Sequence, residues 1–271
     1  MKVALALLLF SVTVTDDYGY AVRLAKPATR IVSLSPHLTE LVYAAGGGAS
    51  MVGAVDYSDF PPPARKLPRV GSDAHINLES VLSLKADLIV AWPNAGTVRA
   101  VDRLTELGIP VFRSEPRDLE DIATTLERLG ILAGSEAQAR RSAKEFRERK
   151  AALEKRYSHR AKVRVFYQVW DRPLITVNGE HVISKVIGLC GGENVFAALP
   201  LIAPEVDAEA VLKARPDVLL TSTSDARPPR WLAGVHVAVV PPDLIQRHTP
   251  RLLDGAEHVC KALEKARSGR S

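Results

Sequence analysis

The chain has 271 residues, of which 46% are hydrophobic and 25% charged, so it can form one large or two ordinary domains with normal apolar cores. This composition excludes a disordered protein. The formal net charge is +5, but the densest basic segment, residues 140–164, is interleaved with Glu145, Glu148 and Glu154. That spacing is typical of a solvated helix face, so we expect no nucleic-acid partner.

The first residues are a lysine after the initial methionine and then a short apolar run, residues 3–10. This pattern is typical of a secretory signal peptide, and the run is too short to span a bilayer. Small residues at the cleavage positions predict cleavage after Ala21, so residues 1–21 are expected to be the leader. Asp16 and Asp17 are unusual in such a segment, and the alternative is a buried first strand.

After the leader, short apolar strands alternate with capped helices, which predicts a parallel sheet wrapped by helices. A helix is expected from Pro36, with Ser35 as its cap and the three glycines at 46–48 as its end. Asn77 is expected to cap a second helix. The other expected elements of this half are strands at 30–34, 51–55, 87–92 and 109–112 and helices at 97–107 and 118–129.

Residues 135–157 contain no Pro or Gly and are rich in Ala, Glu, Arg and Lys, which predicts the longest helix of the chain. Beyond it we expect strands at 163–169, 217–222 and 235–240 and helices at 181–189, 209–214 and 249–265. The expected organisation is therefore an N-terminal α/β lobe over residues 22–134, a linking helix over 135–160 and a C-terminal α/β lobe over 161–271.

One segment occurs twice, about 130 residues apart. When residues 77–92 and 207–221 are aligned, Glu79 falls on Glu209 and Asp87 falls on Asp217, and pairs of apolar residues coincide as well. Each copy predicts a capped helix that leads into a buried strand. Two similar lobes follow from this repeat, and a cleft between lobes is a common place for a small molecule to bind.

Enzyme signatures are absent from the sequence, which contains no G-x-S-x-G elbow, no P-loop and no C-x-x-C pair. The seven histidines are scattered, with no pair at i, i+4. His37, His75 and His248 are interpreted as polar loop or cap residues. We therefore expect a binding protein that needs no metal and no cofactor, and not an enzyme.

Aromatic residues follow several of the expected strands. Tyr57, Trp92 and Trp170 lie beyond carboxyl ends of strands, where open parallel sheets bind ligands. Aromatic side chains at this edge suit a large, flat, partly apolar ligand, although each of them has core packing as an alternative. Arg247, which follows Asp243 after the last strand, is placed to donate to an amide or phosphate. The alternative is a solvated surface arginine.

The two cysteines, Cys190 and Cys260, lack metal-ligand spacing. In an exported protein they can form a disulfide, and closing a loop of that length stabilises by roughly 4 kcal/mol in the chain-entropy model. The alternative is a pair of buried free thiols.

Six motifs point to a known family: IVSLSP at 31–36 with TE at 39–40, YSDFPP at 57–62, NLE at 77–79, DLIVAW at 87–92, CGGENVF at 190–196 and TPR at 249–251. Over roughly residues 28–265 the chain resembles the periplasmic cobalamin-binding proteins, the substrate-binding components of vitamin B12 ABC importers. The opening motif and the glutamate-containing helices are shared with siderophore- and haem-binding relatives. The cysteine-containing motif and the aromatic positions are more specific.

The resemblance implies two Rossmann-like lobes joined by a single long helix, a periplasmic location and a ligand in the cleft between the lobes. It assigns ligand contacts to Tyr57, Trp92, Asp243 and Arg247, to which we add Trp170 from its own position. It also implies a disulfide between the two cysteines. The expected function is the capture of cobalamin or a related corrinoid for an ABC importer, with a haem- or ferric-siderophore-binding protein of the same architecture as the alternative.

The resemblance gives Glu79 and Glu209 a role in docking, because one surface glutamate on each lobe of such proteins contacts arginines of the membrane permease. The expected partners are therefore a permease dimer with its ATPase, and the binding protein itself is expected to be a monomer. A simpler explanation is that both carboxylates favour the dipoles of their helices.

The chain departs from the family at three pocket positions, where Asp73, Val169 and Ala203 replace aromatic residues. Trp170 is interpreted as a substitute from a neighbouring position. A less aromatic pocket leaves the preferred corrinoid open, including one with a different lower ligand or cobinamide.

Overall fold

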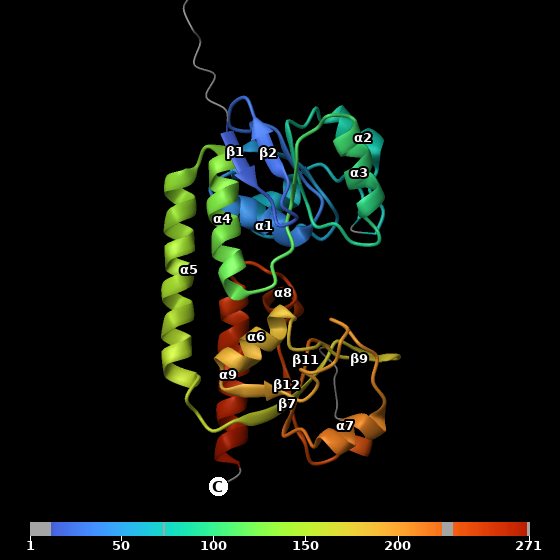
Figure 1. Ribbon diagram of the computed structural model, residues 1–271, viewed down its shortest axis with the longest axis vertical. Helices are drawn as coiled ribbons and strands as arrows, with labels where there is room; N and C mark the ends of the chain where they lie inside the picture. Colours follow the sequence, from blue (N-terminus) through green and yellow to red (C-terminus); the bar gives the residue numbers. More distant parts are fainter. Residues whose placement is uncertain (1–11, 73, 224–229, 270–271) are drawn as a thin grey trace, which may run out of the picture. The chain divides into compact units, whose positions relative to one another are not determined.

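The computed structural model describes residues 12–72, 74–223 and 230–269, and the chain divides into two compact units. Unit 1 comprises residues up to Glu115 together with Thr124–Ala143, and unit 2 comprises Pro116–Ala123 together with Lys144–Ser271. Each unit has the α/β architecture that the alternating pattern predicts, with a parallel sheet and helices (Figure 1). The division differs from the expected lobe boundaries because residues 116–123 group with unit 2.

Unit 1 is built on a four-stranded parallel sheet with the strand order β4-β3-β5-β6. The strands are β3 (Ile31–Ser33), β4 (Met51–Ala54), β5 (Leu88–Ala91) and β6 (Val111–Arg113). All four residues of β5 are buried, as expected for a strand with neighbours on both sides and helices over the sheet.

The helices of unit 1 begin and end close to the predicted positions. They are α1 (Pro36–Ala44), α2 (Leu78–Ser83), α3 (Val98–Glu106) and most of α4 (Leu119–Ala133). The glycines after α1 end it as predicted, because Gly46 has a φ of +90°, a conformation that side chains rarely adopt. Apolar side chains from α2 and α3, including Val81, Val101 and Leu104, pack with strand residues in one buried cluster.

The end of the expected leader belongs to a hairpin in which β1 (Val12–Thr15) pairs antiparallel with β2 (Ala21–Leu24). Asp16 is buried, and its Oδ1 accepts hydrogen bonds from the backbone N–H groups of Tyr18 and Tyr20. Asp17 forms an ion pair with Arg128. Cleavage after Ala21 would remove β1 and both carboxylates from this hairpin. Residues 1–11, which contain the apolar run, lie outside the described residues.

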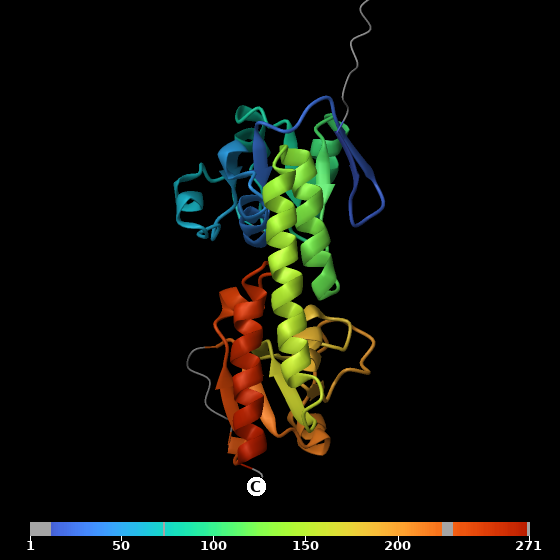
Figure 2. The same ribbon diagram turned by 90° about the vertical axis from the view of Figure 1, so that its left-hand side faces the viewer.

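The predicted long helix is α5 (Glu136–Tyr157), and the division between the two units falls within it. Its charges are those of a solvated face: Arg140 pairs with Glu136, and Lys144 with Glu148. Within unit 2, Arg149 joins α5 to α9 (Leu252–Ser268) through carboxylates of α9, and the two helices lie side by side in Figure 2.

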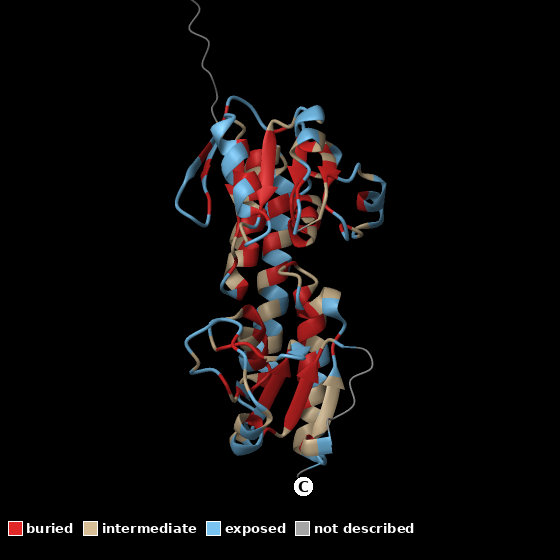
Figure 3. Ribbon diagram, turned by 90° about the vertical axis from the view of Figure 1, so that its right-hand side faces the viewer, coloured by how far each residue is buried: buried red, intermediate tan, exposed pale blue. Residues whose placement is uncertain are grey.

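Unit 2 contains a second four-stranded parallel sheet, with the order β10-β7-β11-β12. Its strands are β7 (Val163–Gln168), β10 (Gly192–Asn194), β11 (Val218–Thr221) and β12 (His236–Val239). The central strands β7 and β11 are almost wholly buried, as the red arrows of the lower sheet in Figure 3 show. A small hairpin, β8 (Trp170–Asp171) and β9 (Leu174–Ile175), follows β7 and was not predicted.

The helices of unit 2 are α6 (Val182–Leu189), α7 (Ala208–Ala214), the short α8 (Pro242–Ile245) and α9. Cys190, directly after α6, forms a disulfide with Cys260 in α9, so the alternative of two free thiols is wrong. The disulfide therefore links the end of α6 to α9, across a sequence separation of 70 residues. Within the described part of the chain, no helix is both long enough and apolar enough to cross a membrane.

The sequence repeat corresponds to one structural unit that is built twice. The side chains of Asn77 and Asp207 cap α2 and α7. Each accepts a hydrogen bond from the backbone N–H three residues along, that of Ser80 or Ala210. At the other end of each helix an arginine side chain binds a backbone carbonyl. Arg30 donates to the carbonyl of Leu84 after α2, and Arg164 donates to the carbonyl of Ala214 at the end of α7. The repeated aspartates, Asp87 and Asp217, accept from the backbone N–H groups of those same two arginines.

Candidate ligand-binding and docking sites

The carboxyl ends of β4, β3 and β5 lie at one edge of the unit 1 sheet and carry three side chains of interest. Tyr57 follows β4, His37 begins α1 after β3, and Trp92 directly follows β5. Because these strands are parallel and adjacent, their following loops share this edge. Tyr57 is 77% exposed and Trp92 is 38% exposed, so the core-packing alternative is wrong for Tyr57, while Trp92 is only partly buried.

The position of Trp92 depends on a buried histidine. The ring of His37 meets the indole edge to face, with 5.8 Å between ring centroids, and Nδ1 of His37 lies 2.6 Å from Oγ of Ser35. Ser35 stands at the helix start as predicted, but its side chain makes no cap hydrogen bond and contacts His37 instead. Oγ1 of Thr97 donates to the carbonyl of Trp92 and so fixes its backbone.

Buried hydroxyl groups fix the loop that contains Tyr57. Tyr57 itself has a φ of 61°, in the left-handed region that residues other than glycine rarely adopt. The next residue, Ser58, is fully buried, and its Oγ accepts a hydrogen bond from Oγ1 of Thr39 in α1. Arg69 donates to the carbonyls of Val55 and Ser58 on either side of the tyrosine. The exposed ring is thus presented by a fixed loop.

Unit 2 has its own face at the carboxyl ends of β7, β11 and β12. Trp170 lies two residues after β7 and is 59% exposed, so it does not pack in the core; its indole N–H donates to the carbonyl of Arg172. Beyond β12, Asp243 and Arg247 lie one helical turn apart and form an ion pair with 3.0 Å between Oδ1 and Nη2. The Arg247 side chain is 14% exposed, so the solvated-arginine alternative is wrong.

Two half-buried histidines, His181 and His248, contact each other in unit 2. The rings of His181 and His248 are 6.0 Å apart and nearly perpendicular. Burial lowers the pKa of His181 to about 4 and also that of His248 to about 4, with the neighbouring His181 as a second cause for His248. Both rings are therefore neutral at pH 7. Nδ1 of His181 accepts from the N–H of Ile183 and so caps α6.

The predicted docking residues lie on short exposed helices. Glu79 is in the first turn of α2 and Glu209 in the first turn of α7, and both are exposed. Carboxylates at these positions favour the helix dipoles, so this simpler explanation holds alongside any docking role.

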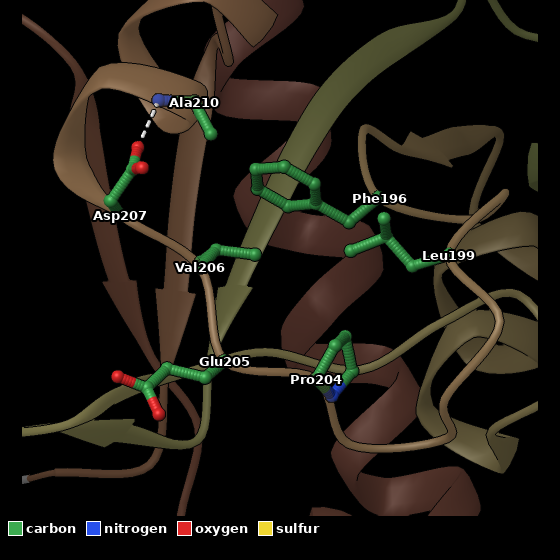
Figure 4. A pocket seen from close by; sticks show the side chains of 7 residues that line it. All are labelled: Phe196, Leu199, Pro204, Glu205, Val206, Asp207 and Ala210. Atoms are coloured by element: carbon green, nitrogen blue, oxygen red, sulfur yellow. Dashed lines mark hydrogen bonds between the residues drawn. The ribbon is translucent and has the colours of Figure 1, made fainter.

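A groove of about 490 Å³ lies beside the start of α7. Figure 4 shows the side chains of Phe196, Leu199 and Val206 pointing toward one another, while the Glu205 carboxylate points away from them. The groove is thus apolar inside, and carboxylates stand at its border.

Other residues that the sequence singled out have no special surroundings. His75 is exposed in a turn, where its N–H donates to Ser72. Val169 pairs its N–H with the carbonyl of Ile175, and Ala203 is exposed, whereas Asp73 lies outside the described residues. Among the described residues, no three His, Cys, Asp or Glu side chains cluster as a metal site.

Sequence reasoning missed two ring contacts, His37 with Trp92 and His181 with His248. The members of each pair are far apart in the chain, and neither pair has a motif that joins them. The one available signal was that His37 lies at the start of a helix that follows a strand.

Comparison with known proteins identifies the architecture. Residues 31–236 match the model of a family described as periplasmic binding protein. The vitamin B12-binding protein of Vibrio parahaemolyticus is 36% identical over 255 residues, which cover 90% of this chain and 93% of that protein.

Comparison with solved structures also identifies a periplasmic binding protein fold. The crystal structure of the periplasmic vitamin B12-binding protein of Vibrio cholerae is 38% identical with a TM-score of 0.82, and the match covers 89% of this chain and 98% of that one. The periplasmic haem-binding protein of Vibrio cholerae shares the fold, with a TM-score of 0.74, but is 20% identical over 87% of this chain and 98% of its own.

Proposed function

This chain belongs to the periplasmic binding protein family, and on that premise we propose that it captures cobalamin or a related corrinoid and delivers it to an ABC importer. Its relatives are substrate-binding proteins, so it is not an enzyme, and the corrinoid is its cargo and not a cofactor. The observation that carries the proposal is the 38% identity to a vitamin B12-binding protein over nearly the whole chain. Haem-binding proteins share the fold at much lower identity.

The candidate ligand contacts supply the chemistry that a corrinoid needs. A corrin ring is broad and largely apolar, with amide groups around its rim. The exposed rings of Tyr57 and Trp92 in unit 1 and of Trp170 in unit 2 offer apolar area and stacking at small entropic cost. Arg247, oriented by Asp243, offers planar N–H donors to an amide or phosphate of the ligand.

Delivery requires a surface that the importer recognises. We propose that Glu79 and Glu209 dock on cationic side chains of a permease dimer, which works with its ATPase, and that the binding protein acts as a monomer. The support is the duplication itself: two identically capped helices each present one exposed carboxylate. A partner with two equivalent subunits offers two equivalent sites.

We propose that the protein reaches the periplasm through a leader that ends before Val12, since the residues from Val12 onward pair in the β1–β2 hairpin. The location agrees with the periplasmic relatives and with the disulfide, which persists in an oxidising compartment.

Titration calorimetry with cyanocobalamin, cobinamide and haem tests the proposal. We expect saturable binding of a corrinoid at one site per chain, and no comparable binding of haem. The absorbance spectrum of protein purified from its own cells is an independent test, because corrin and haem bands differ. Binding of haem but of neither corrinoid would replace the proposed cargo with the alternative.

A further inference from the structure

The repeated helices expose a leucine next to each proposed docking carboxylate. Leu82 in α2 is 44% exposed, and Leu212 in α7 is 48% exposed. Each leucine lies three residues after its glutamate, and residues at i and i+3 share one face of a helix. A carboxylate and an apolar side chain therefore stand together on the outer face of both helices.

A single exposed leucine is ordinary on a protein surface. Here two exposed leucines, Leu82 and Leu212, stand at equivalent positions of the sequence repeat. Along residues 78–83 and 208–213 the order of buried, half-buried and exposed positions is identical. In each helix the preceding residue, Val81 or Val211, is fully buried and fills the core contact. The leucines are thus not needed by the cores of their own units.

Hydrogen bonds at both ends of α2 and α7 fix the backbone that carries each glutamate and leucine. An Asn or Asp side chain caps the start of each helix, and an arginine, Arg30 just before β3 or Arg164 in β7, donates to a carbonyl group at its end. Such short helices gain a defined orientation from these contacts. On unit 2 the apolar groove of Figure 4 borders the same helix through Ala210.

We propose that Leu82 and Leu212 are the apolar anchors of the docking surface and insert into the two permease subunits beside the cation that binds each glutamate. This inference rests on the proposed docking role of Glu79 and Glu209. The occupant is a protein with two equivalent subunits, because the same glutamate–leucine pair is exposed once on each unit. The partner site it requires is an arginine or lysine next to an apolar depression, present once in each of two equivalent subunits.

The test measures binding of cyanocobalamin-loaded protein to the purified permease–ATPase complex of the same genome in lipid nanodiscs, by biolayer interferometry. Leu82→Ala and Leu212→Ala should each weaken binding about tenfold, in keeping with the removal of a buried leucine side chain. Leu107→Ala is the matched control, since Leu107 is also 46% exposed but lies at the end of α3. Its affinity should equal that of the unsubstituted protein.

The outcomes separate the inference from its premise. If Glu79→Ala with Glu209→Ala abolishes binding but the double leucine variant binds like the unsubstituted protein, the leucine anchors are excluded and the glutamate docking stands. If the glutamate variant binds normally, or the unsubstituted protein does not bind at all, the docking proposal itself fails. Leucine-dependent binding to phosphatidylglycerol vesicles without the complex would assign the face to a membrane and overturn the inference. Unchanged cyanocobalamin affinity in all variants verifies their folding.

Discussion

Lys85 and Arg215 adopt the same left-handed backbone conformation, with φ values of 49° and 46°, where α2 and α7 end. They occupy equivalent places in the sequence repeat, so the repeat preserves a strained turn as well as a pattern of apolar residues. Residues other than glycine adopt this conformation at a cost of about 1 kcal/mol or more. The fold therefore carries this conformational cost at the ends of both α2 and α7.

Glycine at either position should relieve this strain. We expect Lys85→Gly and Arg215→Gly each to raise the free energy of unfolding by about 0.5 kcal/mol, after the greater chain entropy of glycine in the unfolded state is subtracted. Urea titration followed by circular dichroism measures the change. Lys85→Ala keeps the strain and should give no gain, and a gain for alanine equal to that for glycine would show that the backbone conformation is not its cause.

The contact between His37 and Trp92 should matter for ligand binding. His37→Ala removes the ring that meets the indole edge to face, a contact typically worth about 1 kcal/mol, so corrinoid affinity should fall by about fivefold. Trp92→Ala should cost more, because it removes the contact surface itself. Calorimetry measures both effects. His37→Phe keeps an aromatic ring at the same place and should restore most of the affinity, an outcome that a purely structural role of the imidazole would not give.

Acid should destabilise unit 2 through the half-buried pair His181 and His248. Each has a folded-state pKa of about 4 and an unfolded value near 6.5, so between these values the unfolded chain binds more protons and stability falls as the pH falls. The loss for one such histidine reaches roughly 3 kcal/mol by pH 4. Thermal unfolding between pH 7.5 and 4.5 measures it. His181→Asn retains a capping side chain without a titrating ring, and its melting temperature should depend less on pH.

Loss of the disulfide should destabilise the protein without altering its ligand site. The bond closes a loop with a sequence separation of 70, and in the chain-entropy model its removal costs roughly 4 kcal/mol. Replacement of Cys190 and Cys260 by alanine should lower the urea midpoint, and reduction with dithiothreitol should do the same. Equal midpoints for the oxidised and reduced protein would contradict this account.

The mature protein should retain the β1–β2 hairpin. Intact mass measured on protein exported to the periplasm should place the first residue at or before Val12, and a mature chain that begins at residue 22 would contradict the proposed boundary. Asp16→Ala should lower the free energy of unfolding by about 2 kcal/mol, because it removes the buried acceptor of two backbone N–H groups of the turn. Lys26, exposed just after β2, serves as a control through Lys26→Ala.

The local elements of this protein follow from its sequence. Strands such as 88–91 and helices such as 136–157 are specified by apolar runs, cap residues and glycine positions, which act within a few residues of one another. The repeat of Glu79 and Glu209 likewise predicted two α/β units, because two copies of one helix–strand segment need two sheets to pack against.

Tertiary structure alone decided how distant residues meet. The cleavage pattern at Ala21 is local, and it gave no sign of the contact between Asp17 and Arg128, which lie far apart in the chain. The His37–Trp92 contact, the His181–His248 pair and the matching exposure of Leu82 and Leu212 were hidden for the same reason. Periodicity shows which residues face inward, but a contact or an exposed face depends on which other segment covers that side.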